Sequence, residues 1–520
     1  MHRLVIALVT VIGLIGATFI GGYLLLFSAA TDRAAAMAPA NSSFYLNVYL
    51  QPSTGQQMNL GGLIGRLPGF ADDASLDEKV DQVVQNLIGG AGLDYREQVK
   101  PWLGDQVALA GWPSADDAGS PEVVVIAEVK DPAAAEAAIG DLMAQDGASF
   151  SSETYQGAEL HVSEANSYGF VGEMLVAGPT VEGLQAVVDA QGDATSLADR
   201  DDFRSTMAGL PSDHLASIFI DLAGVADATG LGDQLAGVTT AGAALVAERD
   251  GLRLTGSAPF DVDRAAASAR AGFALGGEPS SLVDWMPDDT IAEVVVFGLR
   301  NVLEDATAAA GSTPEGEQLT GALDTIRALA AFGFGIDLDA DVMPLIEREV
   351  GIALTGIADG MPSGQILLRP EDPDAAADAL ARIAERLAST GAAERTETVQ
   401  GTDVTVLTLP EIGDIAYAVS DGIVIFGLGF EDVAAAIEAH ASGGSLAAGE
   451  PYTHAFEVAG ERAGNEAYVD VGAVVDLMGD TLALSDDARD ILSAIGTFGF
   501  SAPSRDDEIE FHASLTVDEP

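Results

Sequence analysis

The chain has 520 residues, of which 48% are hydrophobic, so it is long enough to bury substantial cores and has the composition of a globular protein. Its 81 acidic and 23 basic residues give a formal net charge of -58, which excludes nucleic acid as a partner because phosphate binding needs a positive patch. Cysteine is absent, which excludes disulfides, thiolate chemistry and a lipid anchor on an N-terminal cysteine.

The first predicted element is a transmembrane helix over Leu4 to Phe27, a stretch without any charged residue. At about 1.5 Å per residue it is long enough to cross a bilayer core of about 30 Å, so the bilayer is the first expected partner. We interpret it as an uncleaved signal anchor, with cleavage near Ala34, Ala36 or Ala38 as the alternative. Residues 1–37 then form the anchor and a short linker.

The charges beside this stretch predict its orientation. His2 and Arg3 precede it, whereas Asp32 and Arg33 follow it and cancel. The positive-inside rule therefore places the N-terminus in the cytoplasm and the body outside it, as a single-pass protein of the cell membrane.

The next elements alternate between short strands and single helices. Phe44 to Leu50 places Phe44, Leu46, Val48 and Leu50 on one face, which predicts a strand. Asp131-Pro132 predicts a helix start, because Asp caps free backbone N–H groups and Pro fits the first helical position.

The second half of the chain repeats these signals in the same order. The matching pairs are Pro39 and Pro287, Pro101 and Pro344, Asp131-Pro132 and Asp372-Pro373, Gln156-Gly157 and Gln400-Gly401, and Asp221 and Asp470. Such a register is typical of a duplicated domain with small loop insertions. We therefore expect an α+β protein with two tandem, duplicated units, 38–263 and 286–520, with mostly antiparallel sheets and a linker at 264–285.

The second predicted helix, which begins after Asp372-Pro373, carries one apolar stripe. Leu380, Ile383, Ala384 and Leu387 recur at helical spacing, so this side of the helix is expected to pack on a sheet.

Catalytic motifs are absent from the sequence. The histidines have no metal-ligand spacing, and the chain contains neither a Gly-x-Ser-x-Gly elbow nor a phosphate-binding loop. Pairs of catalytic carboxylates cannot be recognised among 81 acids. We therefore predict no catalytic and no cofactor-binding residues, and no cofactor.

Asp337, Asp339 and Asp341 are the only candidate metal ligands, because a D-x-D-x-D run opens many calcium loops. Such a loop also needs Gly at its sixth position and Glu at its twelfth, where this chain has Val342 and Arg348. A solvated turn or helix cap is the main interpretation and calcium the alternative. The acidic surface as a whole is interpreted as solvated and aggregation-resistant, with adaptation to high salt or divalent cations as the alternative.

Several segments resemble a known bacterial family. They include Ala-Pro-Ala-Asn-Ser-Ser at 38–43, Lys-Pro-Trp-Leu-Gly-Asp at 100–105, Ser-Leu-Ala-Asp-Arg-Asp-Asp-Phe at 196–203 and Phe-Ile-Asp-Leu at 219–222. They resemble the membrane-anchored domain of unknown function 3352 family, whose members are commonly anchored extracytoplasmic proteins. The second unit departs from the pattern, with Leu345 and Ile346 after the proline. The resemblance implies a location but no activity.

The absence of catalytic chemistry from an anchored, two-unit chain favours a non-enzymatic binding or scaffolding component of the cell envelope. Its partner would be an envelope protein or a small ligand. The alternatives are a ligand-sensing or inhibitory module and a carboxylate-dependent extracytoplasmic hydrolase.

Overall fold

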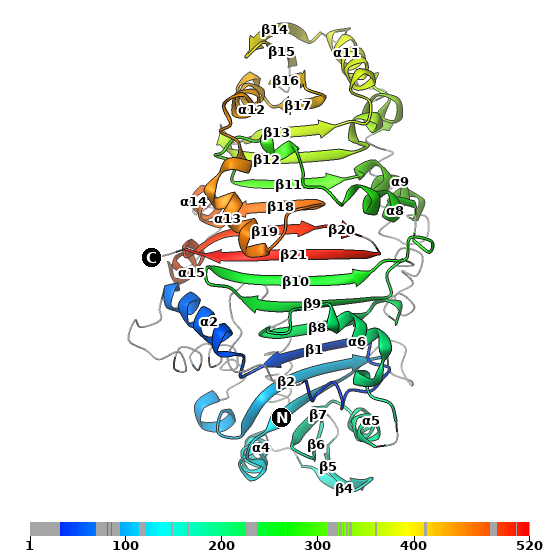
Figure 1. Cartoon of the computed structure of the whole chain (residues 1–520), viewed down its shortest axis with the longest axis vertical. Helices are drawn as coiled ribbons and strands as arrows, with labels where there is room; N and C mark the ends of the chain where they lie inside the picture. The colour runs from blue at the N-terminus through cyan, green and yellow to red at the C-terminus, as the bar shows by residue number, and fades with distance from the viewer. Residues whose placement is uncertain are drawn as a thin grey trace. The chain divides into compact units, whose positions relative to one another are not determined.

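The structure is a computed structural model that divides into two compact units, Met1–Pro259 and Phe260–Pro520 (Figure 1). It describes residues 32–68, 94–113, 121–146, 149–163, 166–192, 194–224, 237–265, 267–309, 335–358, 361–389, 391–409, 413–478, 486–505 and 507–518, and a few single positions between 78 and 85 and between 321 and 331. Within these residues no helix has the length and hydrophobicity needed to cross a membrane. The predicted span Leu4–Phe27 lies outside them.

Unit 1 is built on one antiparallel sheet. Its strands are β1 (Phe44–Tyr49), β2 (Leu103–Trp112), β3 (Glu122–Val129), β4 (Ser151–Tyr155), β5 (Ala158–Val162), β6 (Ser167–Val171), β7 (Met174–Gly178), β8 (Ala216–Asp221), β9 (Thr240–Ala247) and β10 (Gly251–Pro259). They pair in the order β10-β9-β8-β1-β2-β3-β7-β6-β5-β4. Its helices are α2 (Thr54–Arg66), α4 (Pro132–Asp146), α5 (Val181–Gln191) and α6 (Asp201–Ala208), with short helical turns η2 (Tyr95–Val99) and η3 (Leu197–Asp199).

Unit 2 has the same strand order, β21-β19-β18-β11-β12-β13-β17-β16-β15-β14. The strands are β11 (Ala292–Phe297), β12 (Glu349–Ala358), β13 (Met361–Arg369), β14 (Ala393–Val399), β15 (Thr402–Leu409), β16 (Gly413–Ser420), β17 (Ile423–Gly427), β18 (Asn465–Asp470), β19 (Ile495–Ala502), β20 (Ser504–Arg505) and β21 (Glu508–Val517). The helices are α8 (Ala267–Leu275), α9 (Leu299–Ala309), α11 (Pro373–Ser389), α12 (Phe430–Ser442), α13 (Glu450–Ala459), α14 (Val471–Met478) and α15 (Asp486–Ser493). Short helical turns lie at η4 (Leu282–Asp284), η7 (Leu338–Val342), η8 (Met343–Ile346) and η9 (Leu446–Ala448). The predicted mixed α and β structure with mostly antiparallel sheets is therefore confirmed.

Local sequence signals account for several of these elements. Helices α4 and α11 begin at the predicted Asp-Pro pairs, where Asp131 accepts a hydrogen bond from the N–H of Ala134 and Asp372 from that of Ala375. The hairpins β4–β5 and β14–β15 turn at Gln156-Gly157 and Gln400-Gly401, in which both residues of each pair have positive φ. Two such residues in succession form the tight turn that matches the twist of an antiparallel hairpin.

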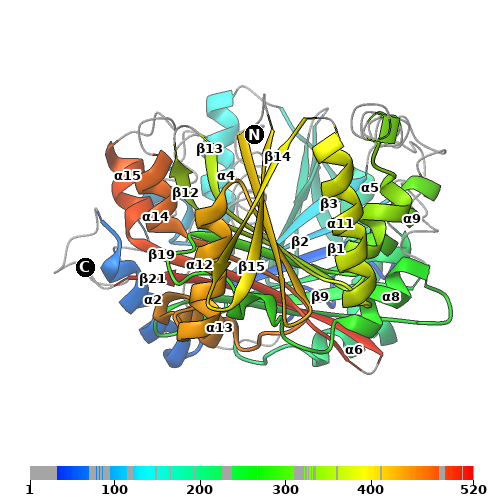
Figure 2. The same ribbon diagram turned by 90° about the horizontal axis from the view of Figure 1, so that it is seen from above.

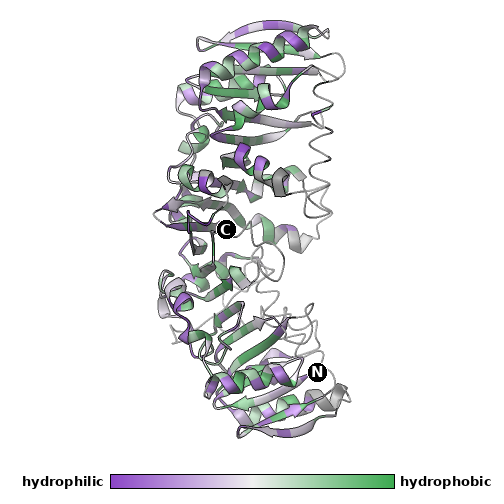
Figure 3. Ribbon diagram, turned by 90° about the vertical axis from the view of Figure 1, so that its right-hand side faces the viewer, coloured by the Kyte–Doolittle hydropathy of each residue, from purple (hydrophilic) through white to green (hydrophobic). Residues whose placement is uncertain are grey.

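Each unit buries apolar side chains between its sheet and its helices, and hydrophobic residues concentrate on the strands (Figure 3). In unit 2 both faces of the sheet are covered in part. Helices α12 and α11 lie on opposite sides of β14 and β15 (Figure 2). The predicted stripe on α11 is confirmed, since Leu380, Ala384 and Leu387 are buried.

The segment 264–285, which we interpreted from the sequence as a linker, contains α8 and η4. Leu282, Val283 and Trp285 are buried there and belong to the core of unit 2. This segment therefore contributes directly to the packing of the second unit.

Candidate functional sites

The candidate metal ligands Asp337, Asp339 and Asp341 lie at the helical turn η7. Asp337 caps the turn, since its Oδ1 accepts hydrogen bonds from the N–H groups of Asp339 and Ala340 at 3.1 and 3.2 Å. Its own N–H donates to Oδ2 of Asp341 at 3.0 Å. Asp339 is exposed, with the guanidinium of Arg327 at 3.4 Å.

Asp341 is buried and paired with two arginines of α11, Arg382 and Arg386. Burial acts to raise its pKa, but the N–H of Asp337 and both guanidiniums favour the charged form, so its pKa lies below the usual value. The positive charge next to Asp341 thus comes from the guanidiniums of Arg382 and Arg386. In unit 1 the turn η2 has the same geometry, with Asp94 as the cap and the neutral Gln98 in place of Asp341. This arrangement favours the cap interpretation over calcium.

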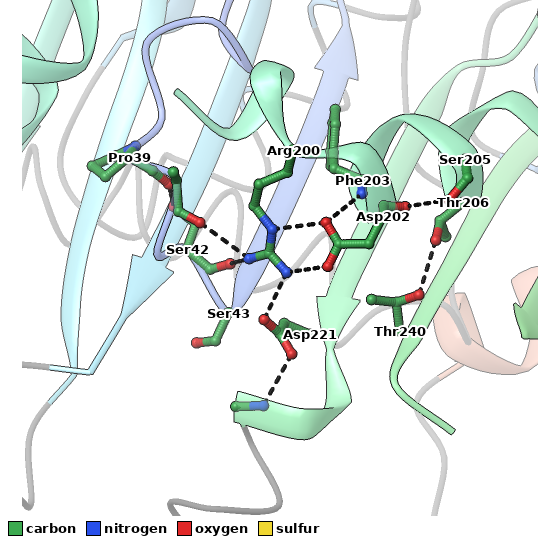
Figure 4. Close-up of polar contacts among 12 residues, drawn as sticks. Pro39, Ser42, Ser43, Arg200, Asp202, Phe203, Ser205, Thr206, Asp221 and Thr240 are labelled. Atoms are coloured by element: carbon green, nitrogen blue, oxygen red, sulfur yellow. Dashed lines mark hydrogen bonds and ion pairs between the residues drawn. The ribbon is translucent and has the colours of Figure 1, made fainter. Parts of the chain in front are cut away.

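Three of the four family-like segments of unit 1 meet at Arg200, which lies between η3 and α6 (Figure 4). Its Nε and Nη2 donate to both carboxylate oxygens of Asp202, and Nη2 also donates to Asp221 at 2.8 Å. Its Nη1 donates to the carbonyl oxygens of Ala40 and Ser42 at 3.1 and 3.2 Å.

All three guanidinium nitrogens of Arg200 therefore have protein partners, and the guanidinium carbon also lies 5.5 Å from the ring centroid of Phe219. The residue joins the turn before β1, helix α6 and strand β8. Arg200 is consequently a structural clamp that joins residues 38–43, 196–203 and 219–222, which lie apart in the sequence.

Unit 2 contains a buried carboxylate cluster that sequence reasoning missed. Glu293 on β11, Glu349 on β12 and Glu466 on β18 are 1%, 0% and 1% exposed. Because Glu466 pairs with Val295 and Glu349 with Phe297, all three side chains lie on the face covered by α12 and α13.

The three carboxylates have different partners. Glu466 accepts from the hydroxyl of Tyr452 at 2.9 Å, from Nε of Arg462 at 2.8 Å and from the N–H of Ser280 at 2.8 Å. Ser280 also donates through its hydroxyl to Glu349. Within the described part of the chain, neither oxygen of Glu293 has a hydrogen-bond partner. Burial, and then the nearby charge of Glu466, raise the pKa of Glu293 to about 8.

This cluster lies beneath packed helices rather than in a groove. A substrate would have to displace α13 to reach it, because Tyr452 and Phe456 of that helix belong to the same core as Val295. The cluster therefore does not support the hydrolase alternative. No local motif marks it, because the three residues come from distant parts of the sequence and only the strand register brings them together.

The opposite face of β11, β12 and β13 is open in part, although Val350 and Leu368 on this face are buried against η8 and α11. Val294, Ile352 and Ile366 are neighbours across β11, β12 and β13, and they are 48%, 53% and 46% exposed. A groove of about 380 Å³ lies beside them. Its apolar lining includes Ile352, Leu354, Ile366, Ile415, Phe426 and Leu428. We call this surface the open apolar face.

The corresponding strands of unit 1 carry a similar apolar row that is buried. It runs from Leu46 through Leu109 and Val125 to Ala177, and these residues are 5%, 8%, 2% and 3% exposed. The sequence pattern is apolar in both units, so the pattern alone did not reveal that only one row is exposed. An exposed apolar surface of this kind is typical of an interaction site.

These observations define a class: an α+β protein of two units built on antiparallel sheets, in which the described polar clusters hold the fold and an apolar sheet face is exposed. The chain belongs to the family described as "Protein of unknown function (DUF3352)", whose model matches residues 4–517. The resemblance stated from the sequence is thereby confirmed.

A search of curated proteins gave no match. Among solved structures, crystal forms IV, III and I of TP0453 are similar, with 13%, 13% and 14% sequence identity and TM-scores of 0.25, 0.24 and 0.23. The matches cover 43%, 45% and 45% of this chain and 79%, 81% and 80% of those chains. A likeness this weak carries no argument about function.

Proposed function

We propose that this protein is a non-enzymatic, membrane-tethered component of the cell envelope that binds an apolar small ligand on the open apolar face of unit 2. The observation that carries the proposal is the exposure of Val294, Ile352 and Ile366 beside a groove of about 380 Å³. This volume lies within the range of about 300–1,000 Å³ that is common for small-molecule sites.

The strand pairing favours a small apolar ligand over an added peptide strand. Strands β11, β12, β13 and β17 are each hydrogen-bonded to a neighbour on both sides. Their backbone groups therefore have no free edge for β-augmentation, and recognition has to use apolar side chains. Each half-exposed Val or Ile that a ligand covers contributes about 1 kcal/mol to the free energy of binding, because its apolar surface is removed from water.

The test is the binding of a fluorescent fatty-acid probe to the soluble chain that begins at Asp32. We expect the unmodified protein to bind the probe and Ile352→Glu to bind it at least tenfold more weakly, because the ligand would have to desolvate a charge. Ile357→Glu is the matched control, since Ile357 lies on the same strand with a similar exposure of 51% but does not line the groove. Equal binding by both variants, or no binding by the unmodified protein, would contradict the proposal.

The tether is the second part of the proposal, with Leu4–Phe27 in the bilayer, the N-terminus in the cytoplasm and the body outside. Residues 32–38 support an uncleaved anchor, because they belong to unit 1. Asp32 accepts a hydrogen bond from the hydroxyl of Tyr45 at 2.6 Å, and Ala34, Met37 and Ala38 are buried. Cleavage near Ala34, Ala36 or Ala38 would remove part of this core.

We also propose that the two units arose by duplication. Their strand orders correspond, and the isolated bridge Pro39–Ser196 of unit 1 has its counterpart in Pro287–Ser445 of unit 2. The hairpin turns at Gln156-Gly157 and Gln400-Gly401 occupy equivalent positions.

A further inference from the structure

A second group of side chains converges in unit 2, away from the open apolar face. Glu510 and His512 are two residues apart on β21, so both side chains lie on the same face of the strand. Glu461 lies in the loop between α13 and β18. One potential ligand atom from each of these residues lies within 4.8 Å of the other two.

The backbone explains how residues so far apart in the sequence meet. His512 pairs with Ser501 across β21 and β19. The hydroxyl of Ser501 donates to the carbonyl oxygen of Glu461 at 2.7 Å, which holds the loop above the two strands. The position of Glu461 is therefore set by the fold.

The donor set and its spacing suit a transition metal. Nε2 of His512 lies 3.2 Å from Oε2 of Glu510. In a tetrahedral zinc site, metal–ligand bonds of about 2.0–2.2 Å place neighbouring ligand atoms about 3.3 Å apart. The three side chains are largely shielded, with exposures of 24% for Glu461, 28% for Glu510 and 12% for His512.

Arg505 contributes to the geometry of Glu461, because its guanidinium pairs with Oε1 of that carboxylate. A carboxylate has two oxygens, so Glu461 can hold Arg505 with one and a metal with the other. Ligating carboxylates commonly have such an outer partner, which fixes their orientation. The contrast with Asp341 is clear, since two guanidiniums pair there with both oxygens of a single carboxylate.

We propose that Glu461, Glu510 and His512 form a binding site for one divalent transition-metal ion, of which Zn²⁺ is the probe. Imidazole and carboxylate are ordinary zinc ligands, and three protein ligands leave a fourth position for water. The bound ion would tie the loop after α13 to the C-terminal strand β21 and would stabilise unit 2. This inference is independent of ligand binding on the open apolar face.

The experiment uses the full chain, solubilised in detergent and stripped of metal with a chelator. Titration calorimetry with Zn²⁺ should show one site per chain, and the melting temperature should rise when the site is filled. Two single variants, Glu510→Gln and His512→Gln, should each weaken this binding at least tenfold. Circular dichroism checks that each variant folds, and Glu510→Gln carries the test if His512→Gln does not fold.

Two control variants separate this site from general effects of histidine and of acidic charge. His161→Gln removes a histidine from β5 of unit 1, and Asp339→Asn removes an exposed acid from η7. Both should bind Zn²⁺ as the unmodified protein does. The proposal is overturned if Zn²⁺ binds no better than Mg²⁺ at matched ionic strength. It is also overturned if Glu510→Gln and the folded His512→Gln both keep full affinity, since Arg505–Glu461 and Glu510–His512 would then be only ion pairs.

Discussion

Replacing Glu293 by Gln should make unit 2 more stable at alkaline pH. The carboxyl group of Glu293 is 1% exposed and has no hydrogen-bond partner among the described residues, and its pKa is raised from 4.5 to about 8. Between these two values the folded protein keeps the proton while the unfolded chain releases it. The contribution of Glu293 to the free energy of unfolding is therefore fully present below about pH 4.5 and is lost as the pH rises toward 8.

The size of the effect follows from the two pKa values. One pH unit corresponds to about 1.36 kcal/mol, so the interval between 4.5 and about 8 corresponds to about 5 kcal/mol at most. Glutamine has the size of a protonated glutamic acid but does not titrate. At pH 4.5 the variant should match the unmodified protein, and at pH 8.5 it should exceed its stability by several kcal/mol.

The assay is urea unfolding followed at a series of pH values between 4.5 and 8.5. Glu431→Gln is the control, because Glu431 is an exposed glutamate in the first turn of α12. Burial also raises the pKa of Glu349, so part of the pH dependence should persist in Glu293→Gln. If the two variants have the same pH dependence, Glu293 is ionised in the folded protein and the reasoning fails.

Three further predictions follow from the clamp, the anchor and the net charge. Arg200→Ala should destabilise unit 1 by about 3 kcal/mol, because it leaves Asp202 and Asp221 without their cation, whereas the exposed control Arg204→Ala should change the free energy of unfolding by less than about 1 kcal/mol. Mass spectrometry of the protein extracted from membranes should find the N-terminal segment intact, and a mature N-terminus near Ala38 would contradict the anchor. The melting temperature should rise between 0.01 M and 0.15 M NaCl, because the Debye length falls from about 30 to about 8 Å and screens the repulsion of a chain with net charge -58. No change across that range would mean that the acidic residues are arranged to avoid one another.

Local chemistry made part of this fold predictable. The caps Asp131 and Asp372 act on backbone groups within three residues, and the Gln-Gly turns need only two residues with positive φ. Such signals depend on neighbours in the sequence. They identified helix starts and the matching order of signals in the two halves, but they predicted neither the hairpin turns nor the strand order.

The burial of each strand face was not predictable in the same way. The alternation in β1 selects Phe44, Leu46 and Val48 as its apolar face, yet Tyr45 on the other face is 0% exposed. The ring of Tyr45 packs in the core of unit 1 against Phe203, and its hydroxyl donates to Asp32 in a segment that the sequence offered only as a linker. The Glu461, Glu510 and His512 group likewise depends on the pairing of β19 with β21.

The two units neutralise acidic side chains with arginines at different positions of the fold. Arg200 in unit 1 lies between η3 and α6, and the corresponding position of unit 2, between η9 and α13, is Gly449. Asp221 and Asp470 each accept a hydrogen bond from the backbone N–H three residues further on, but Asp221 also pairs with Arg200, whereas Gly449 offers Asp470 no such cation. In unit 2 the guanidinium of Arg462 pairs with the buried carboxylate of Glu466. The strand order is therefore the same in both units although the arginine that neutralises an acidic side chain stands at a different position in each.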